Sequence, residues 1–250
     1  MARQQSSSRG GLIRLIAPLL VVFVSVSGCA LQHNQSAQKA SDPVEAYRQL
    51  GEAYLQQGNL PRAMTALDRA LAIDASDPAA LQAMAIVYQR QGEVNLAEQY
   101  FDSALSLAPD FTRARNNYAS FLYDQGRTQA ACEQLEVAVK DMHYTNRSQL
   151  YTNLGRCEWE LGDVASARRD LQRAQEIDSH QPLSYLTLAE LEYAQGNLLR
   201  ARSQLDRYVS LAGQTPAARH LKREISIAES STAATVTSDT QPRPATPGAL

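Results

Sequence analysis

Residues Asn117–Ala138 read NYASFLYDQGRTQAACEQLEVA, and this stretch decides the fold. Its first half places Tyr118, Ala119 and Leu122 at three- and four-residue steps, which puts them on one face of a helix. Gly126 supplies the left-handed conformation that commonly ends a helix. The second half continues at helical spacing through alanine and leucine. The stretch therefore predicts two helices joined by a tight turn.

The same pattern recurs along the chain with a nearly constant period. The turn glycines are separated by 34, 34, 36 and 34 residues, and they are Gly58, Gly92, Gly126, Gly162 and Gly196. Small residues precede them in phase, at Gly51, Ala85, Ala119, Gly155 and Ala189, and follow them at Ala63, Ala97, Ala131, Ala167 and Ala201. Small side chains where two helices cross let the backbones come close. This period with these small positions resembles the tetratricopeptide repeat.

The repeats predict an all-α fold, a right-handed superhelical solenoid, because one helical hairpin cannot bury both of its faces alone. Five repeats fit, at about 44–77, 78–111, 112–145, 148–181 and 182–215. Asp42 followed by Pro43 is typical of a helix start. Residues 216–229 keep helical spacing with a polar face, which predicts a capping helix, so the repeat domain spans 42–229. Residues 230–250 are rich in Ser, Thr, Ala and Pro and are predicted to be disordered.

The first 28 residues have the pattern of a secretory signal. Arginines precede an apolar run over residues 15–26 that is short for a membrane span. Val26–Cys29 resembles a bacterial lipoprotein box, in which Cys29 is acylated and anchors the protein in a membrane. The alternative is an ordinary signal peptide with an incidental cysteine. Ala30, rather than aspartate, follows the cysteine, which favours the outer membrane, and residues 29–41 are expected to be a flexible tether.

Charge and composition argue against several classes of function. Without the three arginines of the signal, Lys plus Arg falls from 24 to 21 against 26 acidic residues, so the mature chain is acidic and has no basic stripe for nucleic acid. The four histidines do not pair at metal-ligand spacing, and there is no phosphate-binding glycine loop or nucleophile elbow. We therefore expect no enzymatic activity, cofactor, metal or small-molecule substrate.

Two cysteines remain once Cys29 is assigned to the lipid anchor. Cys132 falls in the second helix of repeat three and Cys157 in the first helix of repeat four, which packs beside it. An even pair in an oxidising compartment predicts a disulfide. Two buried free thiols are the alternative. The extra two residues between these repeats fall within Asp141–Arg147, where Met142 and Tyr144 are expected to pack locally; a binding loop is the alternative.

The concave surface is the candidate binding site. First helices of tetratricopeptide repeats usually present their second, fifth, ninth, twelfth and thirteenth positions to that side. The residues predicted to line a partner-binding groove are Arg48, Leu55, Ile86, Arg90, Arg113, Asn116, Tyr123, Trp159, Leu186 and Tyr193. The apolar members are expected to have no core partner and to receive an extended or helical apolar segment. For Trp159, packing between neighbouring helices is the alternative.

The lipoprotein box, the tether, the five repeats and the phrases Asn117–Arg127 and Asn153–Cys157 together resemble the type IV pilus biogenesis and stability lipoproteins, the PilF/PilW family of secretin pilotins. The resemblance implies an outer-membrane, periplasm-facing lipoprotein that binds secretin subunits and promotes their localisation and multimerisation. Relatives tend to carry a cysteine where this chain has Tyr123, and here Cys132 takes its place. Two alternative functions are an adaptor for outer-membrane barrel assembly and an activator of a peptidoglycan synthase or hydrolase.

Overall fold

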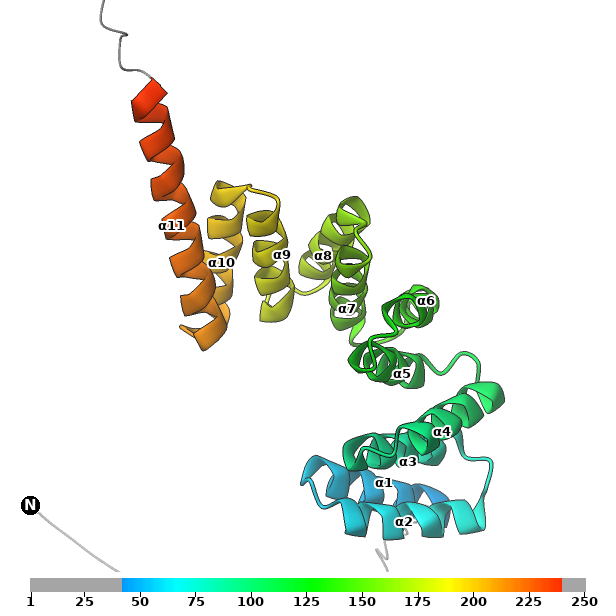
Figure 1. The fold of residues 1–250 in the computed structure, drawn as a ribbon. Helices are drawn as coiled ribbons and strands as arrows, with labels where there is room; N and C mark the ends of the chain where they lie inside the picture. The colour runs from blue at the N-terminus through cyan, green and yellow to red at the C-terminus, as the bar shows by residue number, and fades with distance from the viewer. Residues whose placement is uncertain (1–41, 240–250) are drawn as a thin grey trace, which may run out of the picture. The chain divides into compact units, whose positions relative to one another are not determined.

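The computed structural model describes residues 42–239, and these residues are entirely helical and irregular, without strands (Figure 1). The helices are α1 (Pro43–Gln56), α2 (Leu60–Ile73), α3 (Pro78–Gln91), α4 (Val94–Leu107), α5 (Thr112–Asp124), α6 (Thr128–Ala138), α7 (Arg147–Glu160), α8 (Val164–Ile177), α9 (Pro182–Ala194), α10 (Leu198–Ala212) and α11 (Pro216–Asp239). The first ten form five antiparallel hairpins in chain order. The predicted all-α fold class of paired helices is confirmed.

Each hairpin turn follows the local chemistry of its sequence. The turn glycines have positive φ, for example 72° at Gly58 and 86° at Gly162, which residues with a side chain rarely adopt. Asp42 begins α1 by accepting a hydrogen bond from the backbone N–H of Val44 at 3.0 Å, and Pro43 occupies the first turn. The capping by Asp42 and the proline in the first turn therefore account for the start of α1.

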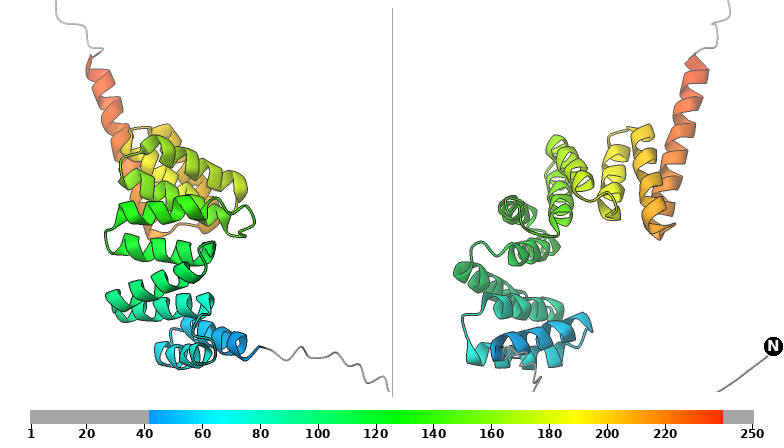
Figure 2. Two further views of the ribbon diagram at one scale, coloured as in Figure 1. Left: turned by 90° about the vertical axis from the view of Figure 1, so that its right-hand side faces the viewer. Right: turned by 180° about the vertical axis from the view of Figure 1, so that it is seen from behind.

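Small residues set the crossing of the two helices within a hairpin. A Cβ added at Gly51 would lie 2.6 Å from the side chain of Leu67, and one added at Gly155 would lie 2.8 Å from Leu171. The helices consequently pack with their backbones close together. Larger side chains fill the space between hairpins, as Phe101 of α4 does against Tyr118 and Phe121 of α5. Figure 2 shows the pairs following one another in the order of the sequence.

The connection between α6 and α7 contains the two-residue insertion and is bordered by a disulfide. Cys132 of α6 and Cys157 of α7 are bonded, with their Cα atoms 5.7 Å apart, so the predicted disulfide is confirmed and the free-thiol alternative is wrong. Tyr144 packs against the core cluster around Phe101. Met142 is 64% exposed and does not join it. The local packing predicted for this loop therefore holds for the tyrosine alone.

Helix α11 is longer than the sequence pattern indicated. It continues to Asp239, so residues 230–239 are helical where a disordered tail was predicted. The segment contains no glycine or proline before Pro242, and Ser230 donates its hydroxyl to the carbonyl of Ser226 within the helix. The predictions for residues 1–41, including the lipidation of Cys29, and for residues 240–250 lie outside the described residues. Within residues 42–239, no helix has the length and apolar composition needed to span a membrane.

Candidate partner-binding groove

The predicted groove is bordered by the first helices of the hairpins. Helix α1 contacts α3, α3 contacts α5, and α7 contacts α9. Helices α5 and α7, on either side of the insertion, approach each other less closely than these pairs. The groove therefore has a regular N-terminal part, a widened junction and a regular C-terminal part.

The expectation that leucines form an exposed apolar run along this groove is wrong. Leu55 is only 5% exposed and belongs to the same core cluster as Met84 and Val87 of α3. Leu186 is 8% exposed and packs in the cluster that contains Leu205 of α10. Both leucines are buried because neighbouring helices cover them. They therefore have core partners, although the assignment of repeat positions to the concave side predicted none.

The remaining apolar candidates are half-buried rather than open. Ile86, Tyr123 and Tyr193 each pack against a core cluster while keeping part of their surface accessible. Trp159 packs against the cluster of Leu171 and Leu188, in agreement with the alternative interpretation of this residue as inter-helix packing. The apolar surface available in the groove is thus discontinuous.

A charged network occupies the N-terminal part of the groove. Glu52 of α1 accepts from the guanidinium of Arg48, one helical turn earlier, at 3.2 Å, and from that of Arg113 of α5 at 3.1 Å. Arg48 also lies 3.7 Å from the carboxylate of Asp77, which precedes α3. Glu52 therefore links the first and third repeats through Arg113.

Two further contacts tie α3 to its neighbours. The guanidinium of Arg90 donates to the backbone carbonyl of Leu55 at 2.6 Å, and this carbonyl near the end of α1 also accepts from the N–H of Gly58 at 3.0 Å. Gln89 donates to the carboxylate of Asp124 on α5 at 3.5 Å. Arg90 itself is exposed, so it also offers charge to the groove.

Polar side chains bridge the widened junction between α5 and α7. The amide of Asn153 donates to that of Asn116 at 3.0 Å, and Asn116 is 8% exposed. The guanidinium of Arg156 lies 4.3 Å from the ring centroid of Tyr123, a short cation–π contact. Arg156 Nε is buried and donates to no group among the described residues. Burial raises the pKa of Glu190 on α9, and Arg156 opposes that rise.

The charged network and the polar side chains at the junction together form a polar floor of the groove. Sequence reasoning missed three of its residues, Glu52, Asn153 and Arg156. Glu52 and Arg156 occupy the ninth position of their repeats, one of the positions assigned to the concave side. The available signal was that these two charged residues, like Arg48 and Arg113, occupy positions assigned to the concave side.

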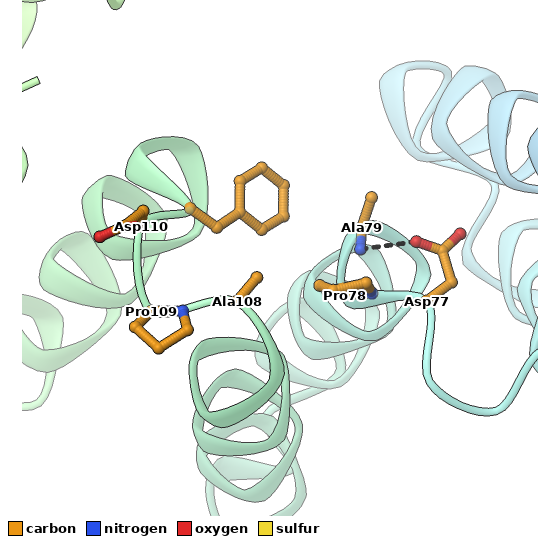
Figure 3. A pocket seen from close by; sticks show the side chains of 7 residues that line it. Asp77, Pro78, Ala79, Ala108, Pro109 and Asp110 are labelled. Carbon is orange, nitrogen blue, oxygen red and sulfur yellow. Dashed lines mark hydrogen bonds between the residues drawn. The ribbon is translucent and has the colours of Figure 1, made fainter.

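A hollow of about 480 Å³ adjoins the charged network (Figure 3). It lies between the start of α3 and the turn that joins α4 to α5, and it is lined by Asp77, Pro78, Ala79, Ala108, Pro109, Asp110 and Phe111. Asp77 caps α3 by accepting from the N–H of Ala79 at 2.9 Å, the bond drawn dashed in Figure 3. The lining is mainly apolar with carboxylates beside it, which suits an apolar side chain flanked by a cation.

A carboxyl pair lies on α7 and α8, the helices of repeat four. Burial raises the pKa of Glu158 to about 8, and the nearby Asp170 carboxylate adds to the rise. Burial also raises the pKa of Asp170. One carboxyl oxygen of Glu158 is buried and accepts no hydrogen bond. Within residues 42–239, no cluster of three or more His, Cys, Asp or Glu side chains is arranged to hold a metal ion.

Comparison with known families defines the class of protein. Residues 51–92 match a model described as TPR repeat, and residues 83–143 and 158–225 match models described as tetratricopeptide repeat. Together with the five hairpins, these matches define a tetratricopeptide-repeat protein, a class of scaffolds that typically lacks catalytic activity.

The particular family follows from a curated relative. The type IV pilus assembly protein PilF of Pseudomonas aeruginosa (strain PAO1) is 32% identical over 202 residues, which cover 79% of this chain and 80% of PilF. The chain belongs to the PilF family. The solved structure of Pseudomonas aeruginosa PilF has a TM-score of 0.70 at 33% identity, covering 77% of this chain and 88% of that one. The crystal structure of PilW, a widely conserved type IV pilus biogenesis factor, shares the fold with a TM-score of 0.71 at 24% identity, covering 79% and 91%.

Proposed function

We propose that this protein is an outer-membrane lipoprotein of type IV pilus biogenesis that binds secretin subunits and promotes their localisation and multimerisation. The observation that carries the proposal is the match to a type IV pilus assembly protein over four-fifths of its length. The lipoprotein box ending at Cys29 supports an anchor facing the periplasm. The partners are thus a secretin subunit and, through the N-terminal lipid, the membrane.

The groove is the proposed binding surface, with its chemistry revised. Its polar floor favours a segment that brings hydrogen-bonding groups as well as apolar side chains. Arg90 and Arg113 offer accessible cations, and Ile86, Tyr123 and Tyr193 offer partial apolar surface. The hollow beside Phe111 could receive one apolar side chain of the same segment. Leu55 and Leu186 serve this surface only by holding its helices together.

The experiment separates the anchor from the groove. Cys29→Ser should release the protein from outer-membrane fractions, whereas Arg90→Glu/Arg113→Glu should leave it anchored and reduce secretin multimers and pili. Arg69→Glu/Arg173→Glu is the matched control, because both residues are exposed on second helices and the charge change is equal. Circular dichroism checks that each variant is folded.

Three results would count against the proposal. Secretin multimers at the wild-type level in the folded groove variant would move the binding site elsewhere. A Cys29→Ser variant that still fractionates with the outer membrane would remove the anchor. Loss of many unrelated outer-membrane barrels when the protein is deleted would favour a general barrel-assembly adaptor over a secretin pilotin.

A further inference from the structure

Helix α11 keeps the register of the first helices. It begins at Pro216, 34 residues after Pro182 begins α9, and this interval equals the repeat period. In α9, Tyr185 and Ala189 belong to the cluster that packs against α10. The residues 34 positions later are Arg219 and Arg223. Helix α11 is therefore the first helix of a sixth hairpin, and residues 42–239 contain no second helix after it.

One face of α11 is left open by this arrangement. The residues on it recur at three- and four-residue steps and are all exposed: Arg219, Lys222, Arg223, Ser226 and Ile227. Ile227 is 61% exposed. The opposite side carries Leu221 and Ile225, which are buried in the cluster with Leu205 of α10. Arg219, Arg223 and Ile227 correspond to Tyr185, Ala189 and Tyr193 of α9, which belong to or pack against the cluster that α9 shares with α10.

The charge of this face is positive and largely uncompensated. The two acidic residues of α11 whose side chains the structure describes are engaged elsewhere, since Glu229 accepts from Arg202 of α10 and Glu224 lies within 3.5 Å of the Tyr193 hydroxyl. The side chains of Lys222 and Arg223 bond to no group in the described part of the chain. The protein as a whole carries a formal net charge of −2, so a cationic face on one helix is a local feature.

Arg223 also changes what can pack here. In the five complete hairpins its position holds glycine or alanine, and the second helix crosses so closely that a Cβ at Gly155 would lie 2.9 Å from the Ala167 carbonyl. An arginine side chain keeps a second helix farther away. It can still bind such a helix through carboxylates, because its planar guanidinium pairs with them in bidentate geometry.

We propose that this face of α11 binds an acidic amphipathic helix of a partner protein, which lies beside α11 as α10 lies beside α9. Carboxylates of the partner would pair with Lys222 and Arg223, and one apolar side chain would cover Ile227. This surface is separate from the groove and goes beyond the proposed secretin binding. It would let the end of the repeat stack hold a second partner while the groove is occupied.

The test uses a fluorescent, helix-stapled peptide of 14 residues, the length of α2. The peptide carries glutamates and a leucine on one face, and a control peptide has the same composition with its glutamates spread around the helix. Binding to the full mature chain, made non-acylated by Cys29→Ser, is measured by fluorescence anisotropy. The one-faced peptide should bind, and Lys222→Glu/Arg223→Glu should weaken its binding at least about tenfold.

The controls decide between specific docking and general attraction. Arg69→Glu/Arg173→Glu makes the same charge change on second helices and should leave peptide binding unaltered. Ile227→Ser should weaken binding about threefold with no change of charge. Equal binding of the two peptides, equal weakening by the two double variants, or no binding would overturn the proposal. Binding of phosphatidylglycerol vesicles that depends on Lys222 and Arg223 and is not displaced by the peptide would identify a lipid surface instead, and would also overturn it.

Discussion

The first junction of the repeat stack and the junction between repeats three and four solve the same packing problem differently. At the first junction, α1 and α3 contact directly and bury Leu55 between apolar side chains. At the later junction, α5 and α7 stand farther apart, and Asn116–Asn153 and Tyr123–Arg156 bridge them. A covalent bond between α6 and α7 accompanies the polar bridges.

The difference shows that apolar packing between first helices is replaceable. An insertion of two residues separates the helices, and the chain compensates with a disulfide and with side chains long enough to span the gap. Burial contributes at both junctions, because Leu150 and Leu154 of α7 are buried in one cluster with Leu135 of α6. At the later junction the disulfide and the polar contacts add to that burial. Substitutions at each junction can separate the contribution of burial to stability from that of the disulfide and the polar contacts.

The largest effect is expected from placing a charge at the first junction. Leu55→Asp should lower the free energy of unfolding by about 4 kcal/mol or more, because it removes a buried side chain and buries a carboxylate without a partner. Urea unfolding followed by circular dichroism measures this change. Leu50→Asp on the same helix is the control, since Leu50 is 44% exposed and should change stability little. Equal effects at both positions would contradict the burial of Leu55.

Opening the disulfide tests the later junction. The bond closes a loop with a sequence separation of 25, so removing it should cost about 3 to 4 kcal/mol on the chain-entropy account. We expect Cys132→Ser/Cys157→Ser to unfold at lower urea concentration than the oxidised protein. Dithiothreitol should lower the urea concentration at which the wild type unfolds and should not change that of the variant. A variant as stable as the oxidised protein would mean that the polar bridges suffice at this junction.

A matched pair of glycines sharpens the comparison within the hairpins. A Cβ at either glycine meets a leucine side chain, but in Gly155→Ala it also lies 2.9 Å from the Ala167 backbone carbonyl, whereas at Gly51 the corresponding carbonyl, of Ala63, is 3.3 Å away. Gly155→Ala should therefore destabilise the protein by about 2 kcal/mol and Gly51→Ala by less, since side chains yield more easily than backbone. Thermal melting of both variants measures the two losses of stability. A larger loss for Gly51→Ala than for Gly155→Ala would contradict this prediction.

The smallest effect is expected in the pH dependence of stability, through the carboxyl group of Glu158 in repeat four. The pKa of Glu158 is about 8 in the folded protein, against an ordinary value of 4.5, so the folded state retains a proton that the unfolded state has released. Stability should fall as pH rises from about 4.5 to 8, because ionisation then opposes folding. Glu158→Gln should remove part of this fall, by about 1 kcal/mol at pH 8.5 after allowance for solvent screening. Parallel curves for wild type and variant from pH 5 to 8.5 would exclude this role.

The sequence predicted the hairpins well because their determinants are local. Gly126 and its counterparts require positive φ, and Gly51 marks a close crossing, so the repeat period is written directly in the sequence. The groove was harder to predict because it depends on the angle between successive hairpins. A small rotation about the helix axis moves Leu55 from the groove into the core, and periodicity alone does not define that rotation.

The polar floor was missed for a related reason. Glu52 and Arg113 lie 61 residues apart, and their pairing follows only when repeats one and three are placed in space. Each residue alone reads as part of a solvated helix face. The end of α11 was also missed, because a segment rich in serine and threonine has no strong preference of its own, whereas an established helix extends readily into it.

The contact pattern has a consequence for how the chain acquires its structure. In residues 42–239 every helix makes its main contacts with its first or second neighbour along the sequence. No hairpin must wait for a distant segment, so folding should proceed from the N-terminus one hairpin at a time as the chain is delivered. A chain truncated after α4 should already resist proteolysis, whereas the disulfide forms only once α7 has emerged. The bond therefore forms late and links the first three hairpins covalently to the last two.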